Sequence, residues 1–383
     1  MVNNNCKYRV LHIFSSYGGG IASLIYNLVD NKTEDIIFDT LAFSYENGKK
    51  FVSKIEENNG VCYTMPRIKI EGIKKFIKYI SSIFRTNKYD VIHCHISGWM
   101  ALPFEIIARK NNTHNIIIHA HTTRYDSRLD RISVVNKFNQ WCNFHFANTY
   151  MTCSDLAEKY IFGEKYLKRR KSYFIPNGIN KELFKYPLGE EKKKNIRSKL
   201  DIKDDEIILM HVGRFSYPKN HEFLLKIAHE LKKDCFKFKM ILLGDGERLE
   251  EIKKIIYEEK LEKLVLILGR QDNVAEWMQL ADTILLPSFN EGLPTVAIEA
   301  QAAGTQIILS DTITRQCDLK FGLVHFLSIQ RAKEWKNYIE NNCTIKKYNN
   351  RNYIDEIENK GFTSNSAGKN YCKIIKENII DWR

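Results

Sequence analysis

The stretch Ile207-Ile-Leu-Met-His-Val-Gly-Arg-Phe-Ser-Tyr-Pro-Lys219 decides the fold. It opens with a short apolar run, which predicts a buried strand, and continues through a glycine into a polar loop and a helical pattern near 221–233. The same alternation repeats down the chain. Further strands are predicted at Lys239–Leu243, Val265–Leu268, Thr283–Leu286 and Gln306–Leu309, with helices near 247–259 and 294–303. Such alternation indicates βαβ units and a parallel, doubly wound α/β domain.

The first half of the chain shows the same pattern less regularly. Strands are predicted at Tyr8–Phe14, Asp90–Ile96, Asn115–His121 and Ser172–Ile175, and helices at Ile21–Val29, Ile73–Phe84 and Met100–Lys110. A polar, charged stretch at 181–205 indicates a linker between domains 1–180 and 206–364. We expect a helix at 365–383 to cross back to the first domain. The two domains are expected to face a central cleft, with function in the loops that follow the strands.

Composition narrows the class of protein. The 383 residues carry a net charge of +13, which favours an anionic partner such as nucleic acid, a phosphorylated small molecule or an acidic membrane. No helix-turn-helix spacing or aromatic-interleaved RNA motif is present, so nucleic acid is set aside. The nine cysteines form no C-x-x-C pair, which argues against a disulfide framework or a zinc ribbon. Without a signal-like apolar run or a stretch of ~18 apolar residues, we expect a cytoplasmic protein.

The string Phe289-Asn-Glu-Gly-Leu-Pro-Thr-Val-Ala-Ile-Glu299 predicts a ligand site. Glu291 lies in a loop after a buried strand, and Pro294 suits the first turn of the helix that follows. Free backbone N–H groups at that helix start would bind phosphate. The carboxylates of Glu291 and Glu299 can accept hydrogen bonds from vicinal hydroxyls, although isolated glutamates are more often solvated surface acids.

Two cations follow the strand at 207–212. Arg214 and Lys219 would neutralise a diphosphate, the arginine as a planar fork and the lysine as a mobile point charge. A departing nucleotide diphosphate needs such groups, because negative charge grows on it as the bond breaks. Taken alone, the pair would more often be solvated surface charge.

Four spaced motifs in order resemble the retaining GT-B glycosyltransferases of family 4. They are the string at 212–220, Leu243-Gly-Asp-Gly246, Leu268-Gly-Arg270 and the E-x7-E of 291–299. Tyr217-Pro-Lys-Asn-His221 and the stretch from Glu299 through Ser310-Asp-Thr-Ile-Thr314 are similar to the branch that builds bacterial exopolysaccharide and capsule. The resemblance is dense over 206–314 and sparser over 8–180. It implies a GT-B fold of two Rossmann-like domains.

The resemblance also implies roles for individual residues. Arg214 and Lys219 match the donor-phosphate pair, Glu291 the acid that binds donor-sugar hydroxyls, and Glu299 the one that binds ribose. The backbone N–H groups of Leu293, Pro294, Thr295 and Val296 would meet the pyrophosphate, and Arg270 with Gln271 would hold the base. The chain departs from many members of the family in having Asn220, not glycine, after Lys219.

Two features of the first half remain. Gly19 and Gly20 match the family's glycine loop, which approaches the donor phosphates or the acceptor; a plain tight turn is the alternative. Two H-x-H pairs, His93/His95 and His119/His121, end predicted strands. Metal binding is set aside because no acidic or cysteine set accompanies them. By resemblance, His121 is the active-site histidine.

The segment Glu71–Lys88 leaves two readings open. Five basic residues interleave with isoleucine and phenylalanine, as in a helix that lies on an anionic bilayer. An ordinary surface helix with its apolar face in the core has the same pattern. A lipid-linked acceptor, implied by the resemblance, favours the membrane.

Together these observations predict a retaining glycosyltransferase. It would move a hexose or N-acetylhexosamine from a nucleotide sugar, most simply a UDP-sugar, to a saccharide or lipid-linked saccharide, with no metal and no cofactor besides the donor substrate. The alternatives are a nucleotide-sugar epimerase of the same fold, for which the first domain lacks a carboxylate pair, and a non-catalytic partner protein, which would be free to lose the phosphate pair.

Overall fold

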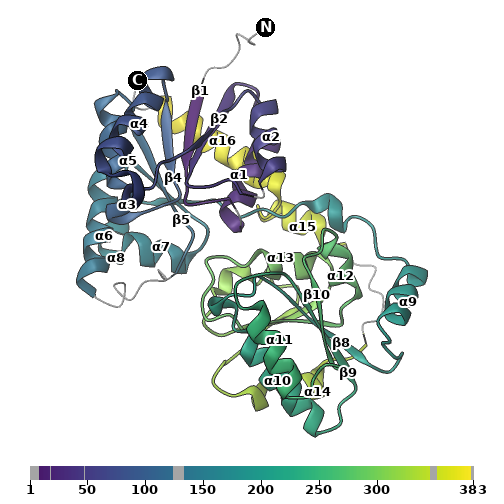
Figure 1. Cartoon of the computed structure of the whole chain (residues 1–383). Coiled ribbons are helices and arrows are strands. Elements are labelled where there is room, and N and C mark those ends of the chain that lie inside the picture. Colours follow the sequence, from purple (N-terminus) through teal and green to yellow (C-terminus); the bar gives the residue numbers. More distant parts are fainter. Residues whose placement is uncertain (1–7, 18, 47, 124–132, 346–351, 381–383) are drawn as a thin grey trace. The chain divides into compact units, whose positions relative to one another are not determined.

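The chain folds into two compact units, one inserted into the other. The computed structural model describes residues 8–17, 19–46, 48–123, 133–345 and 352–380 (Figure 1). The first unit comprises Met1–Gly178 and Gly361–Arg383, and the second Ile179–Lys360. The stretch 181–205, expected as a linker, therefore belongs to the second unit. It carries η3 (Lys181–Phe184) and the charged helix α9 (Glu190–Lys199).

The first unit is built on a seven-stranded parallel sheet. Its strand order is β3-β2-β1-β4-β5-β6-β7. The strands are β1 (Tyr8–Ile13), β2 (Ile36–Ala42), β3 (Cys62–Thr64), β4 (Val91–Cys94), β5 (Asn115–Ala120), β6 (Thr149–Thr152) and β7 (Ser172–Phe174). The longer helices between them are α1 (Gly20–Asp30), α2 (Lys49–Glu57), α4 (Ile73–Thr86), α5 (Leu102–Lys110), α6 (Ser133–Phe146) and α7 (Asp155–Phe162). The order reverses at β1 and β4, as in doubly wound sheets.

One strand missing from the sequence prediction, β2, contains a buried carboxylate. Asp39 lies in its middle and is fully buried. Its two oxygens accept hydrogen bonds from Arg9 on β1 at 2.8 and 2.9 Å, and the Tyr89 hydroxyl donates another at 2.7 Å. A buried ion pair replaces apolar contacts there, which is why the strand lacks a continuous apolar run.

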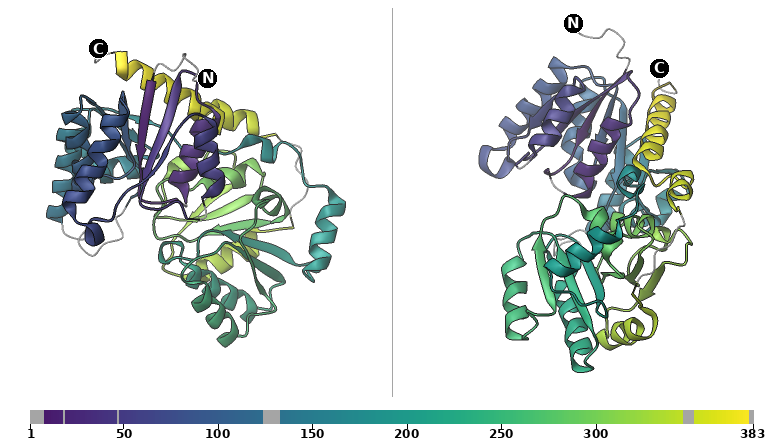
Figure 2. Two further views of the ribbon diagram at one scale, coloured as in Figure 1. Left: turned by 45° about the horizontal axis from the view of Figure 1, so that its top comes forward. Right: turned by 90° about the vertical axis from the view of Figure 1, so that its right-hand side faces the viewer.

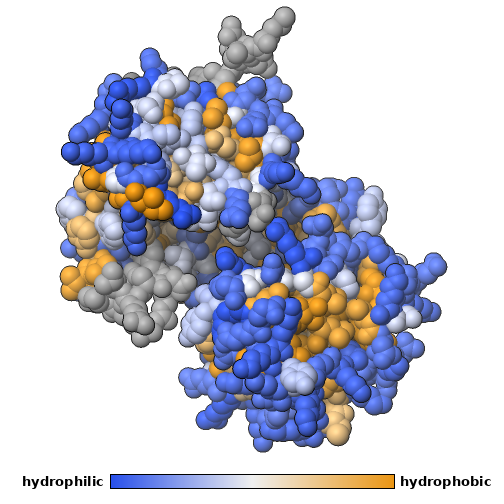
Figure 3. Space-filling view, viewed as in Figure 1, coloured by the Kyte–Doolittle hydropathy of each residue, from blue (hydrophilic) through white to orange (hydrophobic). Residues whose placement is uncertain are grey.

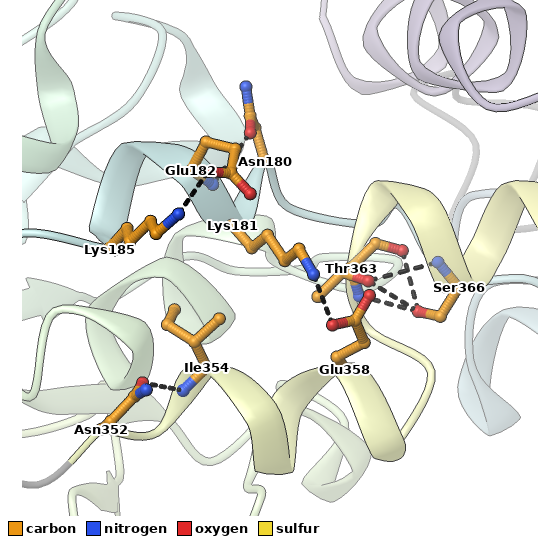
Figure 4. Close-up of polar contacts among 9 residues, drawn as sticks. All are labelled: Asn180, Lys181, Glu182, Lys185, Asn352, Ile354, Glu358, Thr363 and Ser366. Atoms are coloured by element: carbon orange, nitrogen blue, oxygen red, sulfur yellow. Dashed lines mark hydrogen bonds and ion pairs between the residues drawn. The ribbon is translucent and has the colours of Figure 1, made fainter.

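The last helix, α16 (Ser364–Ile380), packs within the first unit against α1, and its yellow ribbon lies along that unit in both views of Figure 2. A reciprocal cap starts the helix: the Ser366 N–H donates to Thr363 Oγ1 at 3.2 Å and the Thr363 N–H to Ser366 Oγ at 3.1 Å (Figure 4). Tyr371 and Ile375 are fully buried in the core that it shares with the sheet. Burial of such large side chains fixes the helix to the sheet.

The second unit has a six-stranded parallel sheet of order β10-β9-β8-β11-β12-β13. Its strands are β8 (Ile207–Val212), β9 (Phe238–Leu243), β10 (Val265–Gly269), β11 (Thr283–Leu286), β12 (Gln306–Ser310) and β13 (Val324–Leu327). Its longer helices are α10 (His221–Lys233), α11 (Leu249–Glu258), α12 (Val274–Leu280), α13 (Thr295–Ala302) and α14 (Ala332–Asn342). β8, β9, β11 and β12 are almost wholly buried, as their continuous apolar runs predict.

The two ends of the second unit are joined by an ion pair. Lys181 Nζ lies 2.6 Å from Glu358 Oε2, which comes from the short helix α15 (Ile354–Asn359) (Figure 4). The chain therefore enters and leaves this unit at one place. Throughout the part of the chain that the structure describes, every helix is too short or too polar to cross a bilayer.

Candidate donor site

Two loops at the carboxyl ends of neighbouring strands are bonded together in the second unit. The Asn220 side chain, after β8, donates to the Pro287 carbonyl, after β11, at 3.1 Å. The Phe289 N–H donates to the Pro218 carbonyl at 2.9 Å, and the rings of Tyr217 and Phe289 stack at 5.0 Å. Asn220 has the left-handed φ of 55°, which asparagine tolerates better than most residues. These contacts hold the loops in a fixed register.

The fixed register brings Lys219 and Glu291 together. Lys219 Nζ lies 2.6 Å from Glu291 Oε1, and the side chains are only 23% and 15% exposed. Gly213 leaves space for the lysine, because a Cβ there would lie 3.4 Å from Lys219 Cδ and 2.9 Å from His211 Nε2. An ammonium and a carboxylate are thus held side by side, partly shielded from solvent, where their interaction is stronger than at a surface.

Glu291 precedes an uncapped helix start. Helix α13 begins at Thr295 with Pro294 as its N-cap, and no side chain caps its first turn. The backbone N–H groups of Leu293, Thr295 and Val296 are suited to bind an anion. Pro294 was expected to contribute as well, but it has no N–H group, so that expectation was wrong.

Glu299 lies one turn inside α13. It is partly exposed, and burial raises the pKa of its carboxyl to about 7. Among the described residues, no group donates a hydrogen bond to this carboxylate. The side chain is therefore an acceptor that the described part of the chain leaves available.

Arg214, predicted to meet the donor diphosphate, pairs with a carboxylate of the chain itself. Its guanidinium lies 3.0 Å from Glu247 Oε2, and the two side chains are 72% and 56% exposed. Glu247 follows β9 and was not among the predicted site residues. The loops after β8 and β9 meet backbone to backbone, since a Cβ on Gly244 would lie 1.9 Å from the Gly213 carbonyl oxygen. An exposed pair of this kind is weak, so the arginine is available to an anionic ligand.

The remaining residues predicted for the second unit follow β10. Arg270 is exposed, and the Gln271 side chain donates to the Leu268 carbonyl at 2.8 Å. Gly269 has a φ of 68° and turns the chain out of the strand. The loop is therefore fixed, with a charged side chain free to approach a ligand.

The first unit holds the other predicted residues. Gly19, with a φ of 81°, is the N-cap of α1, which has no side-chain cap. A Cβ on Gly20 would lie 2.9 Å from Asn177 Nδ2, so a larger residue would displace that side chain. His121 follows β5 and is partly exposed, and burial lowers the pKa of its imidazole to about 3. Its Nε2 lies 2.8 Å from His95 Nδ1.

Comparison with known proteins supplies the family. Residues 192–319 match the family described as glycosyl transferases group 1. The chain is 31% identical over 338 residues to the putative glycosyltransferase EpsF of Bacillus subtilis (strain 168), covering 85% of each chain. The chain belongs to the group 1 glycosyltransferases.

Two further similarities extend this assignment. This glycosyltransferase is 25% identical over 313 residues to the UDP-Gal:alpha-D-GlcNAc-diphosphoundecaprenol alpha-1,3-galactosyltransferase of Escherichia coli, covering 76% of the chain and 78% of the relative. Its structure matches Anabaena Alr3699/HepE, solved in complex with UDP and glucose, with a TM-score of 0.68 at 16% identity, covering 98% and 96% of the two chains. The predicted GT-B fold of two Rossmann-like units is thus confirmed.

Proposed function

We propose that this glycosyltransferase moves a hexose or N-acetylhexosamine from a UDP-sugar, with retention of configuration, to a saccharide or lipid-linked saccharide acceptor. The observation that carries the proposal is the Lys219–Glu291 pair at the uncapped start of α13. A cation, an acceptor of sugar hydroxyl hydrogens and free backbone N–H groups meet there. These are the three kinds of group that a nucleotide diphosphate sugar requires.

Binding of the donor would separate Lys219 from Glu291, and each side chain would take a partner on the donor. The Lys219 ammonium is already held in place by Glu291, so it can shift to the diphosphate at little entropic cost. Glu291 then accepts hydrogen bonds from the sugar hydroxyls, and Arg214 exchanges the exposed Glu247 for a phosphate oxygen. Glu299 accepts from the ribose hydroxyls.

The transfer step then needs no protein nucleophile. The bond from the anomeric carbon to the β-phosphate oxygen breaks, and a bond to the acceptor oxygen forms on the same face. The acceptor proton passes to a β-phosphate oxygen, and UDP leaves with the electron pair of the broken bond. Lys219, Arg214 and the start of α13 stabilise the charge that develops on UDP, which is the role that a metal plays in other transferases.

The choice of substrates rests on similarity. HepE was solved with UDP and glucose, and the Escherichia coli relative is named for UDP-galactose and a diphosphoundecaprenol-linked acceptor. Residues 217–221 and 299–314 resemble the branch that builds surface polysaccharide. We therefore assign the chain to polysaccharide synthesis at the cytoplasmic face of a membrane.

The test is nucleotide release from a panel of UDP- and GDP-sugars in EDTA, with and without a lipid extract that contains candidate acceptors. Release of UDP from one sugar, increased by lipid and strongly reduced in Glu291→Ala, supports the proposal. Proton NMR of the product reports the anomeric configuration, and an inverted product would refute retention. A folded chain that binds UDP, yet turns over no sugar with any extract, would favour the non-catalytic alternative.

A matched control distinguishes site chemistry from general charge. Lys237 and Asp205 form an exposed ion pair elsewhere in the second unit. Lys237→Ala removes the same charge as Lys219→Ala and should leave nucleotide release unchanged. Equal losses in the two variants would contradict the assignment of Lys219.

A further inference from the structure

Five histidines gather on three neighbouring strands of the first unit. His12 lies on β1, His93 on β4 with His95 just beyond it, and His119 on β5 with His121 just beyond it. His12 and His93 are register partners, and β4 lies between β1 and β5 in the sheet. Nearly half of the chain's 11 histidines are therefore in one place. The two H-x-H pairs are visible in the sequence, whereas His12 has no neighbouring histidine there.

The imidazoles form two chains of close nitrogen contacts. His95 Nε2 lies 3.0 Å from His12 Nδ1, and His95 Nδ1 lies 2.8 Å from His121 Nε2. In the second chain, His119 Nδ1 lies 3.2 Å from His93 Nε2, whose own Nδ1 lies 2.8 Å from the Tyr371 hydroxyl. His119 Nε2 is buried and has no hydrogen-bond partner among the described residues. A buried nitrogen without a partner carries a desolvation cost that a ligand would remove.

We propose that His95, His119 and His121 form a binding site for a divalent transition-metal cation, with Zn²⁺ as the type ion. One ring nitrogen from each lies within 4.8 Å of the others. Zn²⁺ with three imidazole ligands at about 2.0–2.1 Å holds those nitrogens roughly 3.4 Å apart, so small side-chain rotations complete the site. Three histidines suffice for zinc, with water in the fourth position.

The other ring nitrogens support this assignment. A metal-bound histidine normally donates its remaining N–H to an acceptor, which fixes its tautomer. His95 Nε2 can donate to His12 Nδ1, and His119 Nδ1 can donate to His93 Nε2. Those tautomers leave the lone pairs of His95 Nδ1 and His119 Nε2 unprotonated. In the metal-free chain, His121 Nε2–H then donates to His95 Nδ1. When the cation binds, that proton would move to His121 Nδ1, which leaves both contacting nitrogens with a lone pair for the metal.

The neighbouring trio of His12, His93 and His95 is a poorer candidate. All three side chains are buried, so a dication would have to enter the closed core. His121, by contrast, is partly exposed and opens the other trio to solvent. Nitrogen ligands favour zinc, copper and nickel over magnesium or calcium.

The proposal goes beyond the transferase assignment, because transfer is proposed to need no metal. A cation bound at this site would hold the His121 ring nitrogen away from the substrate. Zn²⁺ should then inhibit transfer, and EDTA should restore it. Metal binding itself is measured on the chain without any sugar, so it can fail or succeed independently of activity.

The experiment is titration of the metal-free full chain with Co²⁺ and Zn²⁺ near pH 7.5. We expect one equivalent of Co²⁺ to give the visible absorption of a tetrahedral nitrogen site, and Zn²⁺ to displace it. His121→Asn alters a partly exposed position and should weaken binding at least about tenfold. His119→Asn removes the buried ligand and tests the same site in the core.

Controls make the outcome decisive. His114 is exposed and directly precedes β5, so His114→Asn should leave the Co²⁺ spectrum and stoichiometry unchanged. Absence of a bound equivalent in the folded wild-type chain overturns the proposal, whatever the variants do. Undiminished binding by His121→Asn, or loss of binding by His114→Asn, overturns it as well.

Discussion

Lys219 Nζ and Glu291 Oε1 lie 2.6 Å apart, although 72 residues separate them in sequence. The loops after β8 and β11 create this contact through the Asn220–Pro287 and Phe289–Pro218 hydrogen bonds. The pair is therefore built by the backbone before any substrate binds. Such preorganisation is how enzymes place charge where a transition state develops it.

The first prediction concerns this pair. Lys219→Ala should lower kcat by about 100- to 1,000-fold, because one stabilising donor to the leaving group is lost. Lys219→Arg keeps the charge and should recover part of the rate. Since the two side chains interact, Lys219→Ala/Glu291→Ala should lose less than the product of the single effects. Steady-state kinetics on wild type, Lys219→Ala, Glu291→Ala and the double variant measures the coupling. Strictly multiplicative losses would contradict a shared role.

The second prediction is a pH dependence of nucleotide binding. Burial raises the pKa of Glu299 to about 7, so the carboxylate is mostly ionised at pH 8 and mostly protonated at pH 6. Because the ionised form accepts from both ribose hydroxyls, UDP affinity should fall up to about tenfold from pH 8 to pH 6. Calorimetric titration of wild type and Glu299→Gln checks this. The nucleotide's own titration affects both chains alike, and equal pH profiles would exclude Glu299.

The same shift has a consequence for stability. The folded-state pKa of Glu299 lies above the ordinary value of 4.5, so the folded chain binds this proton more tightly than the unfolded chain. Its contribution is most favourable below pH 4.5 and is lost as the pH rises towards 7. Urea unfolding at pH 8 should therefore find Glu299→Gln at least as stable as wild type, while the advantage disappears at pH 5.

The third prediction concerns the membrane. Helix α4 buries Phe76, Ile80 and two further side chains in the core, as an ordinary surface helix does. It leaves Ile73 49% and Ile77 45% exposed, and the adjoining α3 (Ile68–Glu71) leaves Ile70 75% exposed. In Figure 3, hydrophobic residues lie among hydrophilic ones on this face of the first unit. An apolar edge set among lysines suits an anionic bilayer.

Ile70→Glu should therefore reduce binding to anionic vesicles several-fold, and Lys74→Ala should reduce it about fivefold, since one basic residue near such a surface contributes roughly 1 kcal/mol. Vesicle flotation at several salt concentrations measures both. Tyr257 is 72% exposed on the second unit, so Tyr257→Glu serves as the control. Equal binding by all variants, or by neutral vesicles, would refute contact through α3 and α4.

The sequence predicted the second unit better than the first, and the reason is burial. Five of its strands contain apolar runs that the sequence predicts; β13, one of the two edge strands, is only half-buried throughout and was missed. In the first unit, β2 was missed because Asp39 interrupts it, and β6 because it begins and ends with threonine. Strands are predicted from runs of apolar residues. A buried polar residue with a hydrogen-bond partner interrupts such a run, so its strand is missed.

The residues of the candidate site also fall into those that the sequence predicted and those that it did not. Lys219, Glu291 and Glu299 were predicted through a resemblance of motifs, which preserves the spacing along the chain. The Arg214–Glu247 pair was not, since the partner of an exposed side chain depends on loop conformation. His12 was overlooked because it lies beside His93 only through the register of β1 and β4. The Arg9–Asp90 hydrogen bond, between residues 81 apart in sequence, belongs to the same pairing of strands. No local pattern encodes that register.

The last prediction links the C-terminal helix to the histidines. The fully buried Tyr371 hydroxyl on α16 lies 2.8 Å from His93 Nδ1. Tyr371→Phe keeps the ring and removes this partner, leaving a buried imidazole nitrogen unpaired at a cost of about 1–3 kcal/mol. Urea unfolding of the full chain should show that loss in the transition of the first unit, with the second unit's transition unmoved. Tyr257→Phe, at an exposed site, should change neither transition. If Tyr371→Phe unfolds like wild type, the hydroxyl does not hold α16 to the histidine cluster, and ring packing alone accounts for its docking.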